Sequence, residues 1–305
     1  MQSYRVVRRR QDLEMKISAL HRQEQLAIGI LDMADISDLE NTIRWYLENM
    51  NFSLHVMTTA AVAEENGLTE KYQDVNFILF KSAVTTGEAI NAFSNECYTT
   101  LFLVVRSDTE MIAYSGEALI KMMSEKNHPA VITPVLISSQ GDVIPTLRSP
   151  HLRGKDFDPV SLKPSLDENV WDMNLYPVLG LGLYDRALFQ RLRAFDEDIS
   201  GEFYQMADYG VRVYLMGYSI SSSVNLAFRF PRRMSIIEDR SECSGINRFY
   251  TKNFSIHRIA GKNVVEKWKP YVDKGILNDE VKKKLLVLQK TDIFSLIESW
   301  PVKED

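Results

Sequence analysis

The sequence predicts an α/β fold, in which a mostly parallel sheet is flanked by helices and followed by a C-terminal helical region. Two observations support this prediction. Short, almost wholly apolar runs alternate with stretches of helical periodicity, and strands of that composition are typical of parallel sheets covered on both faces. The chain also has 305 residues, of which 45% are hydrophobic, enough to bury a large core.

The predicted elements follow from local composition. The first apolar run, Gln-Leu-Ala-Ile-Gly-Ile-Leu at 25–31, ends at a polar turn over 32–38, and an amphipathic pattern follows it. Apolar residues at i, i+3 and i+4 indicate helix, and continuous short runs indicate buried strand. On these grounds we expect strands at 25–31, 52–57, 75–80, 99–105, 130–137 and 211–220, and helices at 39–50, 60–72, 86–95, 111–126 and 185–194.

Three parts of the chain are expected. We expect an N-terminal helical extension at residues 1–24 and the sheet domain at residues 25–230. A C-terminal helical region, which begins with a polar loop, is expected at residues 231–305. Residues 148–171 are rich in Pro, Asp, Lys and Ser, and predict a long loop of the kind that is functional or disordered.

Composition excludes several classes of protein. The net charge of −5 argues against a nucleic-acid partner, whose binding site would be basic. The two cysteines, Cys97 and Cys243, are too few and too far apart for a disulfide scaffold. The sequence has no signal-peptide core and no run of ~18 apolar residues, so we expect a cytoplasmic protein without a transmembrane segment. The amphipathic first 24 residues could pack on their own domain or on a second copy of the chain, so a homo-oligomer is one possible state.

Polar residues follow three of the predicted strands. Asp32 and Asp35 follow the first strand, Thr58 the second and Asp108 the fourth. Ligands of parallel sheets bind at the carboxyl ends of the strands. We therefore expect these four side chains to gather at one edge, where a nucleotide or another small molecule could bind.

Two segments about a hundred residues apart resemble a known family. The first is Thr99–Asp108, an apolar strand that ends in Arg-Ser-Asp. The second is Gln205–Arg212 followed by Gly217-Tyr218. They resemble the Asp-x-Asp and Glu-Asp-x-Asp-x-x-x-Arg-x-x-x-x-Gly-Tyr regions of GT-A glycosyltransferases of the family-2 type. Further matches over residues 25–220 are Leu39, Gly87, Ala89, Asn91, Gly180, Gly182 and Phe195-Asp196-Glu197.

The resemblance implies a GT-A (Rossmann-like) domain that transfers a sugar from a nucleoside-diphosphate sugar to an acceptor hydroxyl. It implies that Asp108 holds a divalent cation, Mn²⁺ or Mg²⁺, or the diphosphate. A hard cation held by carboxylate oxygens suits a departing diphosphate. The same resemblance sets Asp32, Asp35 and Thr58 beside the nucleoside and adds Asn91 and Arg106 to the donor site. Asp208 is the remaining candidate for an acidic catalytic role near the acceptor.

The sequence departs from the family at both acidic motifs. Arg106 replaces the first acid of Asp-x-Asp, and Met206, which cannot accept a proton, replaces the catalytic base. Arg106 either supplies part of the missing cation's charge at the diphosphate or pairs with an acid such as Asp108. A shifted register would bring Asp208 or Glu202 to the position of the base. The alternatives are a catalytically degenerate GT-A domain that acts as a binding or scaffolding protein, and a different nucleotide-binding α/β enzyme.

Overall fold

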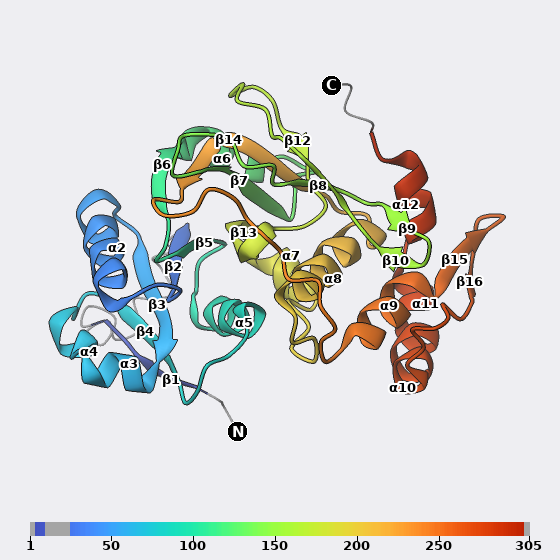
Figure 1. Cartoon of the computed structure of the whole chain (residues 1–305), viewed down its shortest axis with the longest axis horizontal. Helices are drawn as coiled ribbons and strands as arrows, with labels where there is room; N and C mark the ends of the chain where they lie inside the picture. Colours follow the sequence, from blue (N-terminus) through green and yellow to red (C-terminus); the bar gives the residue numbers. More distant parts are fainter. Residues whose placement is uncertain (1–3, 10–24, 302–305) are drawn as a thin grey trace.

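The central feature of the computed structural model, which describes residues 4–9 and 25–301, is a mixed sheet (Figure 1). Its ten strands run in the order β1-β4-β3-β2-β5-β13-β7-β14-β12, with β6 paired to β14. The strands are β1 (Tyr4–Val7), β2 (Leu26–Leu31), β3 (Ser53–Thr59), β4 (Asn76–Phe80), β5 (Leu101–Arg106), β6 (Glu110–Tyr114), β7 (Val131–Ile137), β12 (Asp172–Met173), β13 (Gly182–Asp185) and β14 (Ile220–Arg229).

The parallel part of the sheet confirms the prediction of buried apolar strands. β2 pairs in parallel with β3 and β5, and β3 with β4. Every residue of β2, β4 and β5 is buried. β13 interrupts the parallel order because it lies antiparallel between β5 and β7, and β1, β6 and β12 are also antiparallel to their partners.

Helices cover the sheet and extend the molecule. They are α2 (Ile36–Asn49), α3 (Ala60–Glu65), α4 (Leu68–Lys71), α5 (Thr86–Glu96), α6 (Gly116–Met123), α7 (Arg186–Arg191), α8 (Glu202–Leu215), α9 (Ile246–Phe254), α10 (Lys274–Ile276), the π-helix η3 (Leu277–Leu285), α11 (Leu286–Leu288) and α12 (Ile293–Ser299), with a short 3₁₀ turn, η2 (Val178–Gly180). α2, α3 and α4 lie at one end of the molecule, and α9, α10 and α11 at the other (Figure 1). Phe249, Tyr250 and Ile293 nevertheless belong to the same buried cluster as the sheet.

Three local predictions were wrong. Residues 4–7 form β1, antiparallel to β4, instead of helix; the rest of the predicted N-terminal helix, 10–24, lies outside the described residues. The predicted helix at 111–126 begins as β6 and becomes helical only in α6. The predicted strand at 211–220 is helical up to Leu215, because α8 continues to that residue. In each case pairing or packing with distant residues outweighs local propensity.

Two expected irregular or helical regions contain short strands. The predicted loop at 148–171 includes the pairs β8 (Leu147–Ser149) with β11 (Val160–Leu162) and β9 (Leu152–Arg153) with β10 (Asp156–Phe157). The C-terminal region contains the hairpin β15 (Ile256–Ile259) with β16 (Lys262–Val265) among its helices. Among residues 4–9 and 25–301, no helix has both the length and the apolar character needed to cross a bilayer.

His55 in β3 makes the stability of the fold depend on pH. Its ring is buried against Phe93, and burial is the main cause that lowers the pKa of His55 from 6.5 to about 3. Between these values the unfolded chain binds a proton that the folded chain does not, so stability is lost as the pH falls below 6.5. We expect this residue to contribute a loss of roughly 1.4 kcal/mol per pH unit, about 2 kcal/mol between pH 6.5 and 5.

Urea unfolding of the wild type and of His55→Phe at pH 7 and pH 5 measures this contribution. The variant should lose about 2 kcal/mol less than the wild type over that interval, while the exposed control His151→Phe should behave as the wild type. Equal pH dependence in all three proteins would contradict the assignment to His55.

Candidate functional site

The carboxyl ends of β2, β3 and β5 meet at one edge of the sheet, as predicted. The register aligns Leu31 with Met57 and with Arg106, so the residues that follow these strands lie at the same level. The Ser107 N–H donates to the Leu31 carbonyl at 2.9 Å, and the Met33 N–H donates to the Ser107 hydroxyl at 2.9 Å. These bonds hold the turn after β2 against the turn after β5.

Asp32 and Thr58 bind each other at this edge. The Thr58 hydroxyl donates to the Asp32 carboxylate at 2.6 Å. Burial raises the pKa of Asp32, and the hydrogen bond from Thr58 opposes that shift. Neither residue lines the cavity described next. Their expected contact with a nucleoside therefore stays a prediction.

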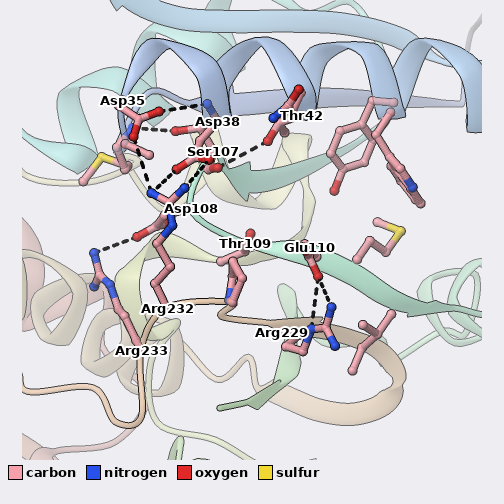
Figure 2. A pocket seen from close by; sticks show the side chains of 18 residues that line it. Asp35, Asp38, Thr42, Ser107, Asp108, Thr109, Glu110, Arg229, Arg232 and Arg233 are labelled. Atoms are coloured by element: carbon pink, nitrogen blue, oxygen red, sulfur yellow. Dashed lines mark hydrogen bonds and ion pairs between the residues drawn. The ribbon is translucent and has the colours of Figure 1, made fainter. Parts of the chain in front are cut away.

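A cavity of about 680 Å³ opens beside this edge, which is within the range of small-molecule sites (Figure 2). Its walls come from α2, from the turn and strand after β5, and from the segment that follows β14. One part of the wall is ionic, with Asp35, Asp38, Asp108, Glu110, Arg229, Arg232 and Arg233. Another part is aromatic and apolar, with Trp45, Tyr46, Met111 and Ile112.

The N-terminus of α2 positions Asp35 and Asp38. Asp35 caps the helix, because its carboxylate accepts the Asp38 N–H at 3.0 Å. Hydrogen bonds from Ser37 and from that N–H lower the pKa of Asp35. The opposite face of the helix, with Leu39 and Ile43, is buried in the core and fixes the orientation of these acids.

Each acidic side chain in the cavity wall forms an ion pair with an arginine. The Arg106 Nε and Nη2 atoms donate to the two oxygens of Asp108 at 2.9 and 3.1 Å, and the Arg233 Nη2 lies 2.6 Å from Asp108 Oδ2. Arg232 pairs with Asp38 at 2.7 Å and with Asp35 at 3.4 Å. Arg229 pairs with Glu110. Figure 2 shows Arg232 and Arg233 extending toward these acids from the segment after β14.

This arrangement does not fit the divalent cation that the sequence led us to expect. Mg²⁺ at phosphate-binding sites is held by one or two carboxylates together with waters and substrate phosphates, and Asp108 is the carboxylate expected to hold it here. Both oxygens of Asp108 already pair with guanidinium groups. Within the described part of the chain, no group of three or more His, Cys, Asp or Glu residues could hold a metal ion.

Asp208 lies in the core and outside the cavity wall. Its carboxylate accepts from Arg212 Nε at 2.8 Å, from Lys252 Nζ at 2.9 Å and from Asn253 Nδ2 at 2.9 Å. Burial would raise the pKa of Asp208, but the charges of Arg212 and Lys252 outweigh it, and the pKa is lowered. A fully buried carboxylate with these partners joins α8 to α9; it is not placed to take a proton from an acceptor.

Asn91 and the residues at the start of α8 also make internal contacts. The Asn91 side chain donates to the Phe195 carbonyl at 2.9 Å and accepts the Phe195 N–H at 3.0 Å, and it lines a second cavity of about 770 Å³ with Arg212 and Lys252. Gln205, at one position of the lost acid pair, accepts the Gly87 N–H at 2.9 Å. Glu202, the shifted-register candidate, accepts from the Thr86 hydroxyl at 2.6 Å.

Of the residues predicted for the site, the structure brings Asp35 and Asp108 to the cavity wall, with Arg106 directly behind Asp108. Sequence reasoning missed Arg232 and Arg233. The only signal was an adjacent pair of basic residues at the start of a polar segment, and nothing local indicated that this segment lies over α2.

Comparisons with known proteins identify the fold. No protein-family model matches the sequence, and no curated protein does. Among solved structures, GalNAc-T7 with UDP, GalNAc and Mn²⁺ superposes with a TM-score of 0.66 at 10% identity, covering 92% of this chain and 57% of that one. Residues 1–349 of S. aureus TarS superpose with a TM-score of 0.45 at 15% identity, covering 67% of this chain and 59% of that one. The mannosyltransferase PcManGT from Pyrobaculum calidifontis, in complex with GDP-Man and Mn²⁺, superposes with a TM-score of 0.46 at 11% identity. The match covers 67% of this chain and 56% of that one.

The chain therefore has a GT-A-like fold, which confirms the fold prediction. It spans little more than half the length of the GalNAc-T7 chain that it matches. At such low identity the likeness establishes the fold, whereas activity has to be argued from the site.

Proposed function

We propose that this protein is a nucleotide-sugar glycosyltransferase whose donor binds in the cavity between α2 and the segment after β14. One observation carries the proposal. Asp108, the acid that follows β5, lies in the wall of a cavity of ligand size at the edge where α/β sheets bind their ligands. The ionic and aromatic parts of that wall suit a donor that has a charged diphosphate and a flat base.

The residues of the cavity have distinct roles in this proposal. Asp108 orients Arg106 and Arg233, and Asp35 with Asp38 orients Arg232. Guanidinium groups bind phosphate oxygens bidentately and neutralise their charge. The acceptor in this proposal is a hydroxyl group, whose proton a general base would remove. The proposal assigns no general base, because the cavity acids are all ion-paired: Asp35, Asp38, Asp108 and Glu110.

A degenerate GT-A-like domain that binds a ligand or partner without turnover is the second candidate. A specific observation favours it: Asp108 and Asp208, the acids that remain of the two motifs, both serve in internal ion pairs. Turnover separates the two candidates.

The full chain should be incubated with UDP-, GDP-, CDP- and dTDP-sugars while thermal unfolding and release of nucleoside diphosphate are measured. We expect one nucleotide to raise the melting temperature, because a ligand at 100 times its Kd stabilises by about 2.7 kcal/mol. We also expect its sugar conjugate to be turned over, by hydrolysis or by transfer to an added acceptor. Binding without turnover would favour the degenerate domain, and no binding by any nucleotide would contradict the donor site itself.

A further inference from the structure

We propose that the cavity binds a nucleoside diphosphate without a metal ion: Arg232 and Arg233 hold the diphosphate, and Trp45 holds the base. This inference rests on the proposed function and specifies how that site recognises its donor. It also differs from the sequence-based expectation, in which Asp108 holds a cation and Asp32 and Thr58 border the nucleoside.

Positive charge around Asp108 is in excess. Two guanidinium groups, Arg106 and Arg233, share one carboxylate, so this cluster carries a net charge of about +1. Arg232 beside it pairs with two carboxylates, those of Asp35 and Asp38, so the ionic wall as a whole is neutral. Arg106 is only 2% exposed, and its Nη1 atom is buried with no hydrogen-bond partner among the described residues. Arg106 alone therefore keeps Asp108 paired when Arg233 turns to another anion.

Arg233 is held in position yet remains accessible. Its carbonyl accepts the Ser139 N–H at 2.8 Å, and its guanidinium lies over the ring of buried Phe230 at 5.3 Å. The side chain is 43% exposed, and that of Arg232 is 67% exposed. Exposed ion pairs stabilise a protein little, so exchanging a carboxylate for a more highly charged diphosphate costs little.

Farther along, the segment is fixed to the body of the protein. Glu238 accepts from Arg148 Nε at 3.0 Å and from the Tyr176 hydroxyl at 3.1 Å, and Arg148 and Tyr176 are buried. The two arginines thus project from a segment whose ends are anchored, at Ser139 on one side and at this cluster on the other. Such a site is preorganised for its anion.

The aromatic part of the wall lies at the far end of α2. Asp35 and Tyr46 are eleven residues apart, about 16 Å along a helix axis, which leaves room for a nucleoside between the arginines and the rings. Trp45 is 37% exposed and packs edge-on against Tyr46, with ring centroids 4.9 Å apart. The Tyr46 hydroxyl is buried with no partner among the described residues, so the exposed ring of Trp45 is the surface on which a base can stack.

Isothermal titration of the full chain with UDP, GDP, CDP, dTDP and the four nucleosides, in EDTA and in Mn²⁺, tests this proposal. We expect one diphosphate to bind with the same Kd in both conditions. Arg233→Gln should weaken the diphosphate roughly 10- to 100-fold and leave the nucleoside unchanged. Trp45→Ala should weaken both ligands. Arg5→Gln, which removes an exposed arginine paired with Glu64 at the far edge strand, is the matched control and should bind as the wild type.

Asp108→Asn distinguishes the arginine site from a metal site. Because Asp108 orients Arg233 and pairs with the buried Arg106, its loss should weaken diphosphate binding to the same extent in EDTA and in Mn²⁺, whereas at a metal site it should abolish binding that depends on Mn²⁺. Binding that requires Mn²⁺ and disappears in Asp108→Asn would overturn this inference and leave the proposed function intact. Unchanged diphosphate affinity in Arg233→Gln would also overturn it. No binding of any nucleotide in either condition would instead contradict the proposed function.

Discussion

Replacing Asp208 by asparagine should lower the free energy of unfolding by about 3–5 kcal/mol, the usual cost of removing one partner from a buried ion pair. The asparagine side chain would fill the same volume but leave Arg212 and Lys252, 4% and 5% exposed, without their shared anion. Urea unfolding at pH 7 measures the loss as a lower transition midpoint at unchanged slope.

Asp279→Asn is the matched control for this experiment. Asp279 pairs with Lys283 one helical turn away, and both side chains are 67% exposed. The control should change stability by less than about 0.5 kcal/mol. A wild-type midpoint for Asp208→Asn would contradict its structural role and return Asp208 to consideration as a catalytic acid.

Replacing Gly210 by alanine should cost about 3 kcal/mol, although alanine has the higher helix propensity. A Cβ atom at this position in α8 would lie 2.1 Å from the Leu175 carbonyl oxygen and 2.8 Å from the Tyr176 Cα. The obstructing atoms belong to the backbone, so α8 or the segment at 175–176 has to move.

Gly275→Ala in α10 separates crowding from helix propensity. Its Cβ would meet only an Asp273 carboxylate oxygen, at 3.3 Å. This variant should be as stable as the wild type or slightly more stable. If Gly210→Ala unfolded at the same urea concentration as Gly275→Ala, the close approach of α8 to residues 175–176 would be wrong.

The fold was predictable where burial leaves a pattern in the sequence. β2, and β5 up to Val105, are apolar because both of their faces are covered, so their runs stand out. α8 was not predicted, since no helix was expected at 202–215 and its last residues were expected as strand; the helix is buried from Phe203 to Leu215. Its polar residues Gln205, Asp208 and Arg212 are buried with the rest, and its Val211–Leu215 end has the composition of an apolar strand.

The candidate site was predictable only where it depends on strand ends. Asp35 and Asp108 follow parallel strands, and the topology of such sheets brings them together. Arg232 reaches Asp35 across 197 residues of sequence, so no local pattern relates them. The Asp208 assignment followed a motif position, but charge partners on α9 that the motif does not include make this acid part of the core.

The position of β13 has a consequence for synthesis of the chain on the ribosome. β5 pairs with β2 on one side and with β13 on the other, yet 75 residues lie between Arg106 and Gly182. At a synthesis rate of 5–20 residues per second, β13 is made roughly 4–15 s after β5. During that interval the nascent chain exposes an apolar strand edge with unpaired backbone groups, which is the feature that promotes aggregation.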